Sequence, residues 1–260
     1  MRHRLLGLAD HRSPFPGCGR AELLRAALSW GRRVRNRRES VLNDRLTIDY
    51  FSDVLCVWAW IAQRRIDEMN DQWGETVRLG FHCVDVFGDA GAKVAAGWSA
   101  RGGYEGFAQH VREVAIRYEA PAVHEYLWTK VRPVTSGTAH LVLKATEIAE
   151  SPLEMTRLSR ALREAFFVDA RDVGDLGVCL EVAQGLGLAA AELKRHVDSG
   201  AAMAALLADY RKAEERGIRG SPSWVMNEGR QVLYGNVGYR ILNANIEELL
   251  RHPEQEASWC

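Results

Sequence analysis

One cysteine, Cys56, stands where the chain changes from a strand-like to a helix-like pattern. Its surroundings read Phe51-Ser-Asp-Val-Leu-Cys-Val-Trp-Ala-Trp60. Residues 46–51 alternate and are rich in strand-forming types, and residues from about 57 to 70 place apolar side chains on one helical face. Unpaired N–H groups and the positive end of the helix dipole favour an anion at the start of a helix. We therefore expect a Cys56 thiol with a depressed pKa, partly ionised near neutral pH and able to act as a nucleophile.

A second motif, far along the chain, reads Gly217-Ile-Arg-Gly-Ser-Pro-Ser-Trp-Val225. Pro222 follows a glycine-punctuated loop and opens a hairpin with strands at 223–226 and 231–234. A proline at the first position of a strand removes no ladder hydrogen bond. The bond before a proline also has access to the cis isomer, which the sequence alone does not show.

The two motifs lie at opposite ends of a regular order of elements. A strand at 46–51, a helix and a strand at 76–86 predict a right-handed parallel β-α-β unit. Helical patterns follow, one of them opened by the capping box Ser151-Pro-Leu-Glu154; they lie at about 103–119, 136–150, 152–166, 175–186, 189–198 and 201–216. The hairpin and a last amphipathic helix at 239–251 end the order.

The fold class predicted from this order is α/β, with β-α-β and β-β-α halves and an all-helical subdomain inserted between them. We expect one domain over residues 46–251, with the insertion at about 90–216. Residues 252–260 are expected to form a C-terminal tail.

The order of elements and the two motifs together resemble the DsbA-like thioredoxin-fold family. The resemblance covers about 46–251 and includes the segment 166–175; it extends to cytosolic dithiol oxidoreductases similar to the frenolicin-pathway protein. The layout is also similar to that of 2-hydroxychromene-2-carboxylate isomerase and the kappa-class glutathione transferases. The resemblance implies that Pro222 is cis and faces Cys56, which leaves the backbone of Ser221 to pair with an extended thiol substrate.

The chain departs from this family at the active-site motif, which in the oxidoreductases usually reads C-P-W-C. Here it reads Cys56-Val57-Trp58-Ala59. Without a cysteine at position 59 the ordinary dithiol cycle is lost. The leading hypothesis is therefore a thiol-disulfide oxidoreductase that acts through Cys56 alone, by monothiol exchange.

Two other functions stay open at this point. One is a glutathione-dependent isomerase or transferase, in which Cys56 orients the cofactor thiolate and Trp58, Trp60 or Trp98 contact a small aromatic substrate. The other is a non-catalytic binding module that holds an extended peptide on the proline surface.

Glutathione is a possible substrate or cofactor, and the sequence does not decide whether it binds. No tightly bound cofactor is expected. The relatives usually hold its γ-glutamyl end with a Ser-Asp or Gln-Asp pair after a glycine, at the last helix. This chain has Gly235-Asn-Val-Gly-Tyr-Arg240 there, so the Asp is absent. Asn236 and Arg240 remain candidates for meeting a carboxylate. The expected partner is a small-molecule or peptide thiol or disulfide; the oligomeric state is not decided, and a homodimer stays open.

The other cysteines, at 18, 83, 179 and 260, do not resemble a disulfide framework or a zinc site. We expect Cys83 and Cys179 to pack in the core. Cys260, the last residue, is either a distant resolving thiol for Cys56 or an exposed tail thiol without a partner, and the second interpretation is favoured. His82 and His140 are expected to be structural, and Trp58 and Trp60 either line a substrate groove or cap the core.

Composition limits the class of protein. The chain has 260 residues, 47% of them apolar, and no run of 18 apolar residues without charges, so no membrane span is expected. Equal numbers of basic and acidic residues, 34 each, argue against a general nucleic-acid binder. Residues 1–45 carry eleven Arg but lack the unbroken apolar stretch of a secretory signal. We expect them to be a poorly ordered Arg-rich extension of a cytoplasmic protein.

Overall fold

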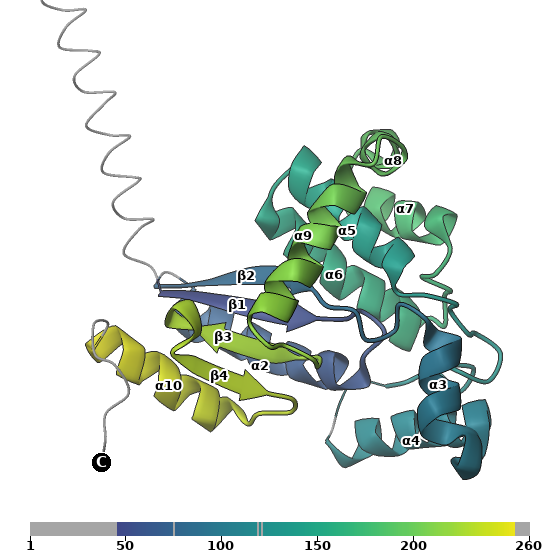
Figure 1. Ribbon diagram of the computed structural model, residues 1–260, viewed down its shortest axis with the longest axis horizontal. Coiled ribbons are helices and arrows are strands. Elements are labelled where there is room, and N and C mark those ends of the chain that lie inside the picture. The colour runs from purple at the N-terminus through teal and green to yellow at the C-terminus, as the bar shows by residue number, and fades with distance from the viewer. Residues whose placement is uncertain (1–45, 75, 119, 121, 253–260) are drawn as a thin grey trace, which may run out of the picture. The chain divides into compact units, whose positions relative to one another are not determined.

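The computed structural model describes residues 46–252, apart from 75, 119 and 121. The expectations for residues 1–45 and for Cys260 lie outside this part of the chain. Within it a four-stranded sheet has the order β2-β1-β3-β4 (Figure 1). The strands are β1 (Leu46–Ser52), β2 (Val77–Cys83), β3 (Ser223–Met226) and β4 (Gln231–Tyr234). β1 is parallel to β2 and antiparallel to β3, which pairs antiparallel with β4. The predicted α/β, thioredoxin-like fold class is confirmed.

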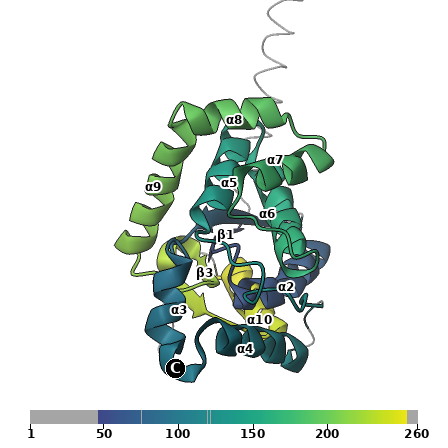
Figure 2. The same cartoon turned by 90° about the vertical axis from the view of Figure 1, so that its right-hand side faces the viewer.

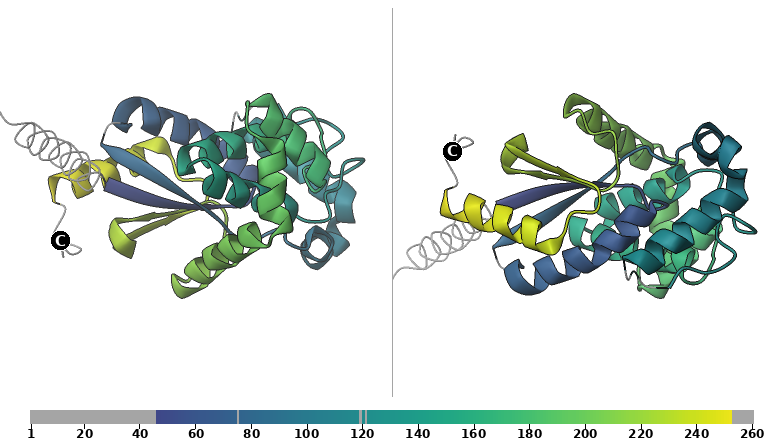
Figure 3. Two further views of the ribbon diagram at one scale, coloured as in Figure 1. Left: turned by 90° about the horizontal axis from the view of Figure 1, so that it is seen from above. Right: turned by 90° about the horizontal axis from the view of Figure 1, so that it is seen from below.

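Helices lie against both faces of the sheet. α2 (Val57–Trp73) and α10 (Tyr239–Arg251) cover one face, and α9 (Ala201–Glu215) crosses the other (Figure 3). Successive side chains of β1 point to opposite faces of the sheet, so the strand contributes to the cores on both faces. Tyr50 belongs to the main core, and Phe51 belongs to a smaller cluster with Ala213 of α9. Because both faces of β1 are buried, its register against β2 and β3 is strongly specified.

The segment between β2 and β3 is helical, as predicted (Figure 2). It contains α3 (Ala90–Trp98), the 3-10 turn η1 (Ser99–Arg101), α4 (Gly103–Arg117), α5 (Gly137–Ala149), α6 (Pro152–Phe167), α7 (Leu176–Gly185), α8 (Ala190–Asp198) and α9. The N-cap half of the predicted capping box is present, since Ser151 Oγ accepts the Glu154 N–H at 3.2 Å and Pro152 is the first residue of α6, while the Glu154 carboxylate accepts from Arg157. None of the helices in the described ranges is long and apolar enough to cross a bilayer.

Two local expectations were wrong. The second strand was predicted to run to residue 86 but ends at Cys83, because the N–H groups of Val86 and Phe87 turn to a buried carboxylate, that of Asp53. The helix α3 was not predicted. Its residues are mostly Ala and Gly, and only Ala90 and Val94 are buried, so the sequence shows little helical periodicity there.

An ion cluster fastens α9 to the sheet. His82 of β2 lies between two carboxylates, with Nδ1 3.0 Å from Asp209 Oδ1 and Nε2 2.9 Å from Asp49 Oδ1. Asp209 also accepts the Cys83 N–H at 2.9 Å. Three cations complete the cluster: Lys144 of α5, Lys212 of α9 and Arg216, which caps the end of α9.

The pKa directions follow from this arrangement. Burial lowers the pKa of His82, but the hydrogen bonds to Asp209 and Asp49 outweigh burial and the repulsion from Lys212, so its pKa is raised. For both carboxylates, burial acts upward and is outweighed by His82 and a neighbouring lysine, so their pKa values are lowered. His82 thus has the structural role predicted for it, since its ring lies between Asp49 of β1 and Asp209 of α9.

We predict that the free energy of unfolding has a pH profile set by this cluster. Stabilisation from a raised histidine pKa is fully present below the unfolded value of about 6.5 and is lost as pH rises through the folded pKa. Stabilisation from the lowered carboxylate pKa values is present above about 3.9 and is lost as pH falls. His82→Gln should therefore lose about 1.5–3 kcal/mol at mildly acidic pH, and the deficit should shrink as pH rises. Urea unfolding measured across the pH range tests this.

The matched control is His196→Gln, because His196 lies on α8 and pairs with Glu192 of its own helix. Its unfolding profile should parallel that of the unaltered chain. Parallel profiles for His82→Gln and the unaltered chain would show that His82 does not hold a proton between the two carboxylates.

Candidate active site

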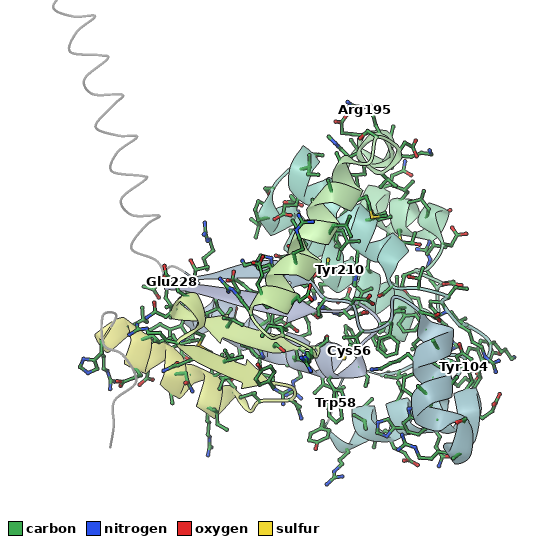
Figure 4. The ribbon with its side chains drawn as sticks, viewed as in Figure 1. Cys56, Trp58, Tyr104, Arg195, Tyr210 and Glu228 are labelled. Atoms are coloured by element: carbon green, nitrogen blue, oxygen red, sulfur yellow. The ribbon has the colours of Figure 1, made fainter. Side chains whose placement is uncertain are left out.

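Cys56 is the N-cap residue of α2, as the sequence predicted. Its backbone carbonyl accepts the N–H groups of Ala59 at 3.0 Å and Trp60 at 3.1 Å, which begins the helix. The side chain makes no capping hydrogen bond and is nearly buried, with 5% of the residue's surface exposed. Figure 4 shows Cys56 and Trp58 close together near the end of the sheet, with Tyr210 of α9 above them.

The second motif faces this cysteine. Cys56 Sγ donates to the backbone carbonyl of Ser221 at 3.2 Å, although the two residues are 165 positions apart. The Asp53 N–H donates to Ser221 Oγ at 2.9 Å, and the Gly235 N–H donates to the Pro222 carbonyl at 2.8 Å. The Ser221–Pro222 peptide bond is cis. The loop before β3 is therefore joined to the start of α2, and the loop after β4 is joined to the loop before β3.

The expected depressed pKa of Cys56 is wrong. Burial raises the pKa of this thiol above its ordinary value, and the negative charge of Asp53 acts in the same direction. The hydrogen bonds from Ser221 and from the N–H groups of Ala59 and Trp58 act downward, as expected at a helix N-terminus, but do not outweigh burial. At neutral pH the resting group is a thiol whose hydrogen is held by the Ser221 carbonyl.

The buried carboxylate of Asp53 connects the segments around Cys56. It is fully buried and accepts hydrogen bonds on both oxygens. Oδ1 accepts the Leu55 N–H at 2.9 Å, and Oδ2 accepts three donors: Val86 N–H at 3.1 Å, Phe87 N–H at 2.9 Å and Ser136 Oγ at 2.8 Å. One side chain thus joins the β1–α2 loop, the chain after β2 and the start of α5.

His140 of α5 supports the same loop from within the core. It is fully buried, its Nε2 accepts the Val54 N–H at 3.4 Å, and its Nδ1 lies 3.4 Å from the Tyr210 hydroxyl. Burial lowers the pKa of His140. A neutral ring that accepts at Nε2 carries its hydrogen on Nδ1, which assigns the tautomer from the hydrogen-bond network. This agrees with the structural role predicted for it.

The tryptophans that the sequence singled out divide between site and core. Trp58, on the first turn of α2, is half-buried and meets Tyr118 edge-on at 5.5 Å between ring centroids. Trp60 is 2% exposed and stacks on Phe167 at 5.5 Å, so it caps the core. Trp98 packs against α4. Trp58 is thus the tryptophan among the three that lies half-exposed beside Cys56.

Asn236 and Arg240 lie on the segment that follows β4. Asn236 comes directly after Gly235, whose N–H binds the Pro222 carbonyl, and Arg240 lies exposed on the first turn of α10. Within the described residues, Asn236 Oδ1 is buried without a hydrogen-bond partner. The structure therefore brings Cys56 into contact with Ser221, the residue before Pro222, and joins Pro222 to Gly235, the residue before Asn236.

The remaining described cysteines are packing residues, as predicted. Cys83 and Cys179 are fully buried, and burial raises the pKa of each, for Cys179 to about 12. Cys179 Sγ donates to the Val173 carbonyl at 3.1 Å. In the part of the chain that the structure describes, no three His, Cys, Asp or Glu side chains are grouped to hold a metal ion.

Sequence reasoning missed the roles of Asp53 and of the Ser221 side chain. A signal for Asp53 was present, since it is an acidic residue in a segment that is otherwise uncharged from Phe51 to Leu55. A charged side chain in such a segment either lies exposed at a break in the buried strand or is buried and accepts several hydrogen bonds. The partners that decide between these lie at 86, 87 and 136, and the sequence does not show that they converge.

Comparisons with known proteins agree with this geometry. The family model for a DSBA-like thioredoxin domain matches residues 47–247. Among curated proteins, the ClpXP adapter protein SpxH of Halalkalibacterium halodurans is 26% identical over 217 residues, which cover 79% of this chain and 68% of SpxH.

Solved structures show the same fold. The cytosolic disulfide reductase DsbM of Pseudomonas aeruginosa, in a structure with GSH, has a TM-score of 0.61 at 22% identity, covering 79% of this chain and 100% of DsbM. A 2-hydroxychromene-2-carboxylate isomerase has a TM-score of 0.58 at 16% identity, covering 82% of this chain and 100% of the isomerase. At these identities the likeness concerns the fold.

We predict that Asp53→Ala destabilises the chain by about 3–5 kcal/mol, because it leaves several buried donors without an acceptor. Asp53→Asn keeps the size but replaces one acceptor oxygen by a donor, so it should lose most of the same stability. Thermal and urea unfolding measure both variants. The control is Asp85→Ala, an exposed carboxylate that accepts one N–H, from Gly88 at 2.9 Å, and should cost about 1 kcal/mol or less. Equal losses at the two positions would contradict the role given to Asp53.

Proposed function

The chain belongs to the DSBA-like thioredoxin domain family, and from this premise we propose that it is a thiol-disulfide oxidoreductase that acts through one reactive cysteine, Cys56. The observation that carries the proposal is the contact between Cys56 Sγ and the backbone of Ser221, the residue before the cis proline. An extended chain that pairs with this backbone as a strand would present its own sulfur to Sγ.

The proposed reaction is monothiol exchange. Cys56 gives up its proton to solvent, and the thiolate attacks one sulfur of a substrate disulfide. A mixed disulfide with Cys56 forms, and the other substrate sulfur leaves as a thiolate that takes a proton from water. Because position 59 is Ala, a second thiol from solution, of the glutathione class, must attack the mixed disulfide and release Cys56.

Glutathione is proposed as the small thiol for this second step. Asn236, the N-terminus of α10 and the exposed Arg240 follow Gly235, whose N–H binds the Pro222 carbonyl, and they offer groups for a carboxylate. DsbM, which shares the fold, has a structure with GSH. The isomerase or transferase alternative is supported by the fold shared with 2-hydroxychromene-2-carboxylate isomerase, and it is opposed by the missing Asp after Gly235.

A binding module is the second candidate function. Three observations favour it: Cys56 is 5% exposed, burial raises its pKa, and position 59 offers no second thiol. SpxH, the curated relative, is an adapter protein. In this function the Ser221 backbone would hold an extended peptide without exchange of disulfides.

We predict that the chain forms a mixed disulfide with glutathione on Cys56 when it is treated with glutathione disulfide, and that Cys56→Ser abolishes it. Because the pKa of Cys56 is raised, the rate should increase about tenfold per pH unit through the neutral range. Intact-mass and peptide mass spectrometry identify the modified residue. The control Cys260→Ser should react like the unaltered chain. No adduct at Cys56 at any pH, together with peptide binding, would replace exchange by the binding-module function.

We predict that Ala59→Cys creates a dithiol site. Residue 59 lies one helical turn after Cys56, which is the spacing that allows a disulfide in this fold. An internal thiol acts at an effective concentration on the order of millimolar, so it should release the mixed disulfide without added glutathione. The measurement is disulfide-coupled turnover without a second thiol. Ala62→Cys, also buried but farther along α2, is the matched control and should give no turnover. Equal behaviour of the two variants would show that residue 59 does not face the reacting sulfur.

A further inference from the structure

A cavity of about 310 Å³ lies between the C-terminal half of α9, the chain after β2 and the loop that leads to Pro222. It is lined by residues 84–85, by residues 217–219 and by three side chains of α9: Tyr210, Ala213 and Glu214. This volume is at the lower end of the range for ligand pockets, so the cavity suits one amino-acid side chain better than a whole small molecule.

The cavity lies on the α9 face of the sheet, next to the exchange site. Its buried apolar residues belong to the smaller core cluster on that face: Val84, Ala213 and Ile218. Cys56 belongs to the main core, with α2 on the other face (Figure 3). The loop that joins the two carries both Arg219, which lines the cavity, and Ser221, whose carbonyl accepts the Cys56 thiol at 3.2 Å.

This arrangement determines which residues of an extended partner turn toward the cavity. Successive side chains of a strand point to opposite faces. When a chain pairs with the Ser221 backbone and turns its cysteine toward Cys56, the residues directly before and directly after that cysteine turn toward the α9 face. The cavity is on that face, so it is placed to receive one of these two side chains.

The lining combines an apolar floor with a charged rim. Val84, Ala213 and Ile218 are each 4% exposed and form the floor. The rim carries the exposed carboxylates of Asp85 and Glu214 and one exposed guanidinium, that of Arg219. None of these three groups forms an ion pair with another residue in the ranges that the structure describes.

The Tyr210 hydroxyl reports the electrostatic environment at the wall of the cavity. Burial raises the pKa of Tyr210, and the negative charges of Asp85, Asp53 and Asp209 act in the same direction. Its oxygen lies 3.4 Å from His140 Nδ1, the nitrogen to which the hydrogen was assigned above. Negative charge therefore surrounds this wall from the rim and from the core, and it favours a cation in the cavity.

We propose that this cavity binds a basic side chain, Lys or Arg, that stands directly before or after the cysteine of an extended disulfide partner. The aliphatic stem of such a side chain lies along the floor, and its charged end reaches the carboxylates of Asp85 and Glu214. An acidic side chain at the same position meets two like charges. The proposal rests on the exchange reaction at Cys56 and names the class of peptide that this reaction uses.

The test compares peptide disulfides that differ in one charge. The probes are pentapeptides with blocked ends and a central cysteine in a disulfide with thionitrobenzoate; Lys, Gln or Glu stands directly before or directly after the cysteine, and the other residues are Ala. The Cys56 thiolate attacks the peptide sulfur, the Cys56–peptide disulfide forms, and thionitrobenzoate leaves as a coloured thiolate whose absorbance gives the rate. Mass spectrometry identifies the peptide on Cys56.

In one of the two positions the Lys peptide should react about threefold to tenfold faster than the Gln peptide, and the Glu peptide should be the slowest. The preference should shrink as salt is added. In the double variant Asp85→Asn, Glu214→Gln the ratio of Lys to Gln rates should fall to about one; Asn at 85 can still accept the Gly88 N–H. The matched control is Glu215→Gln, an exposed carboxylate of α9 outside the cavity lining, which should keep the ratio.

Equal rates for Lys and Gln peptides in both positions overturn the proposal, as does a preference that survives in the double variant or is lost equally in Glu215→Gln. The ratio within one chain cancels any general effect of a variant on Cys56. Absence of any adduct at Cys56, with the peptides and with glutathione disulfide, contradicts the exchange reaction instead. The cavity is then tested by fluorescence anisotropy of dye-labelled Lys and Gln peptides, and equal binding of the two overturns the proposal.

Discussion

The buried carboxylate of Asp53 is the constraint on which the rest of the site depends. A carboxylate taken out of water is stable only when donors replace its hydration, and here the donors come from three separate segments. The same requirement ends β2 at Cys83, because the chain must turn for Val86 and Phe87 to reach Asp53. The backbone of Asp53 extends the coupling, since its N–H binds Ser221 Oγ. The loop before Cys56 and the loop that carries the cis proline are thus both joined to Asp53.

The chemistry of Cys56 is a balance between two effects that act on the same sulfur. The helix N-terminus provides N–H groups that favour a thiolate, an effect of roughly 0.3–2 kcal/mol. Burial removes the hydration of the ionised form, which shifts buried groups by up to several pKa units, and here burial wins. The position of the cysteine on its helix therefore does not by itself make it acidic. The group is therefore kept as a thiol, whose hydrogen the Ser221 carbonyl accepts.

The sequence predicts local features of this protein well and long-range ones poorly. The last helix at 239–251, the hairpin and the cap at Ser151 were predicted because alternation, turn residues and capping chemistry are all local. The helix α3 was missed because a run of Ala and Gly carries no periodic signal. The predicted direction of the Cys56 pKa shift was wrong because the pKa depends on burial against a loop 165 residues away in the sequence. Residue spacing does not show how far that loop buries the thiol.

The raised pKa of Cys56 has opposite effects on the two halves of a disulfide exchange. As an attacking group, a thiol with a higher pKa is less ionised, but each thiolate is more nucleophilic, with a dependence of about 0.4–0.5 log units in rate per pKa unit, so roughly half the loss is recovered. As a leaving group, the same sulfur departs more slowly from a mixed disulfide. With Ala59 in place of an internal thiol, nothing within α2 accelerates that departure. In the proposed exchange, a partner joined to Cys56 would therefore be retained longer than on an acidic dithiol site. In that proposal, exchange with a thiol partner and retention of the partner would follow from the same properties of Cys56, its raised pKa and the Ala at position 59.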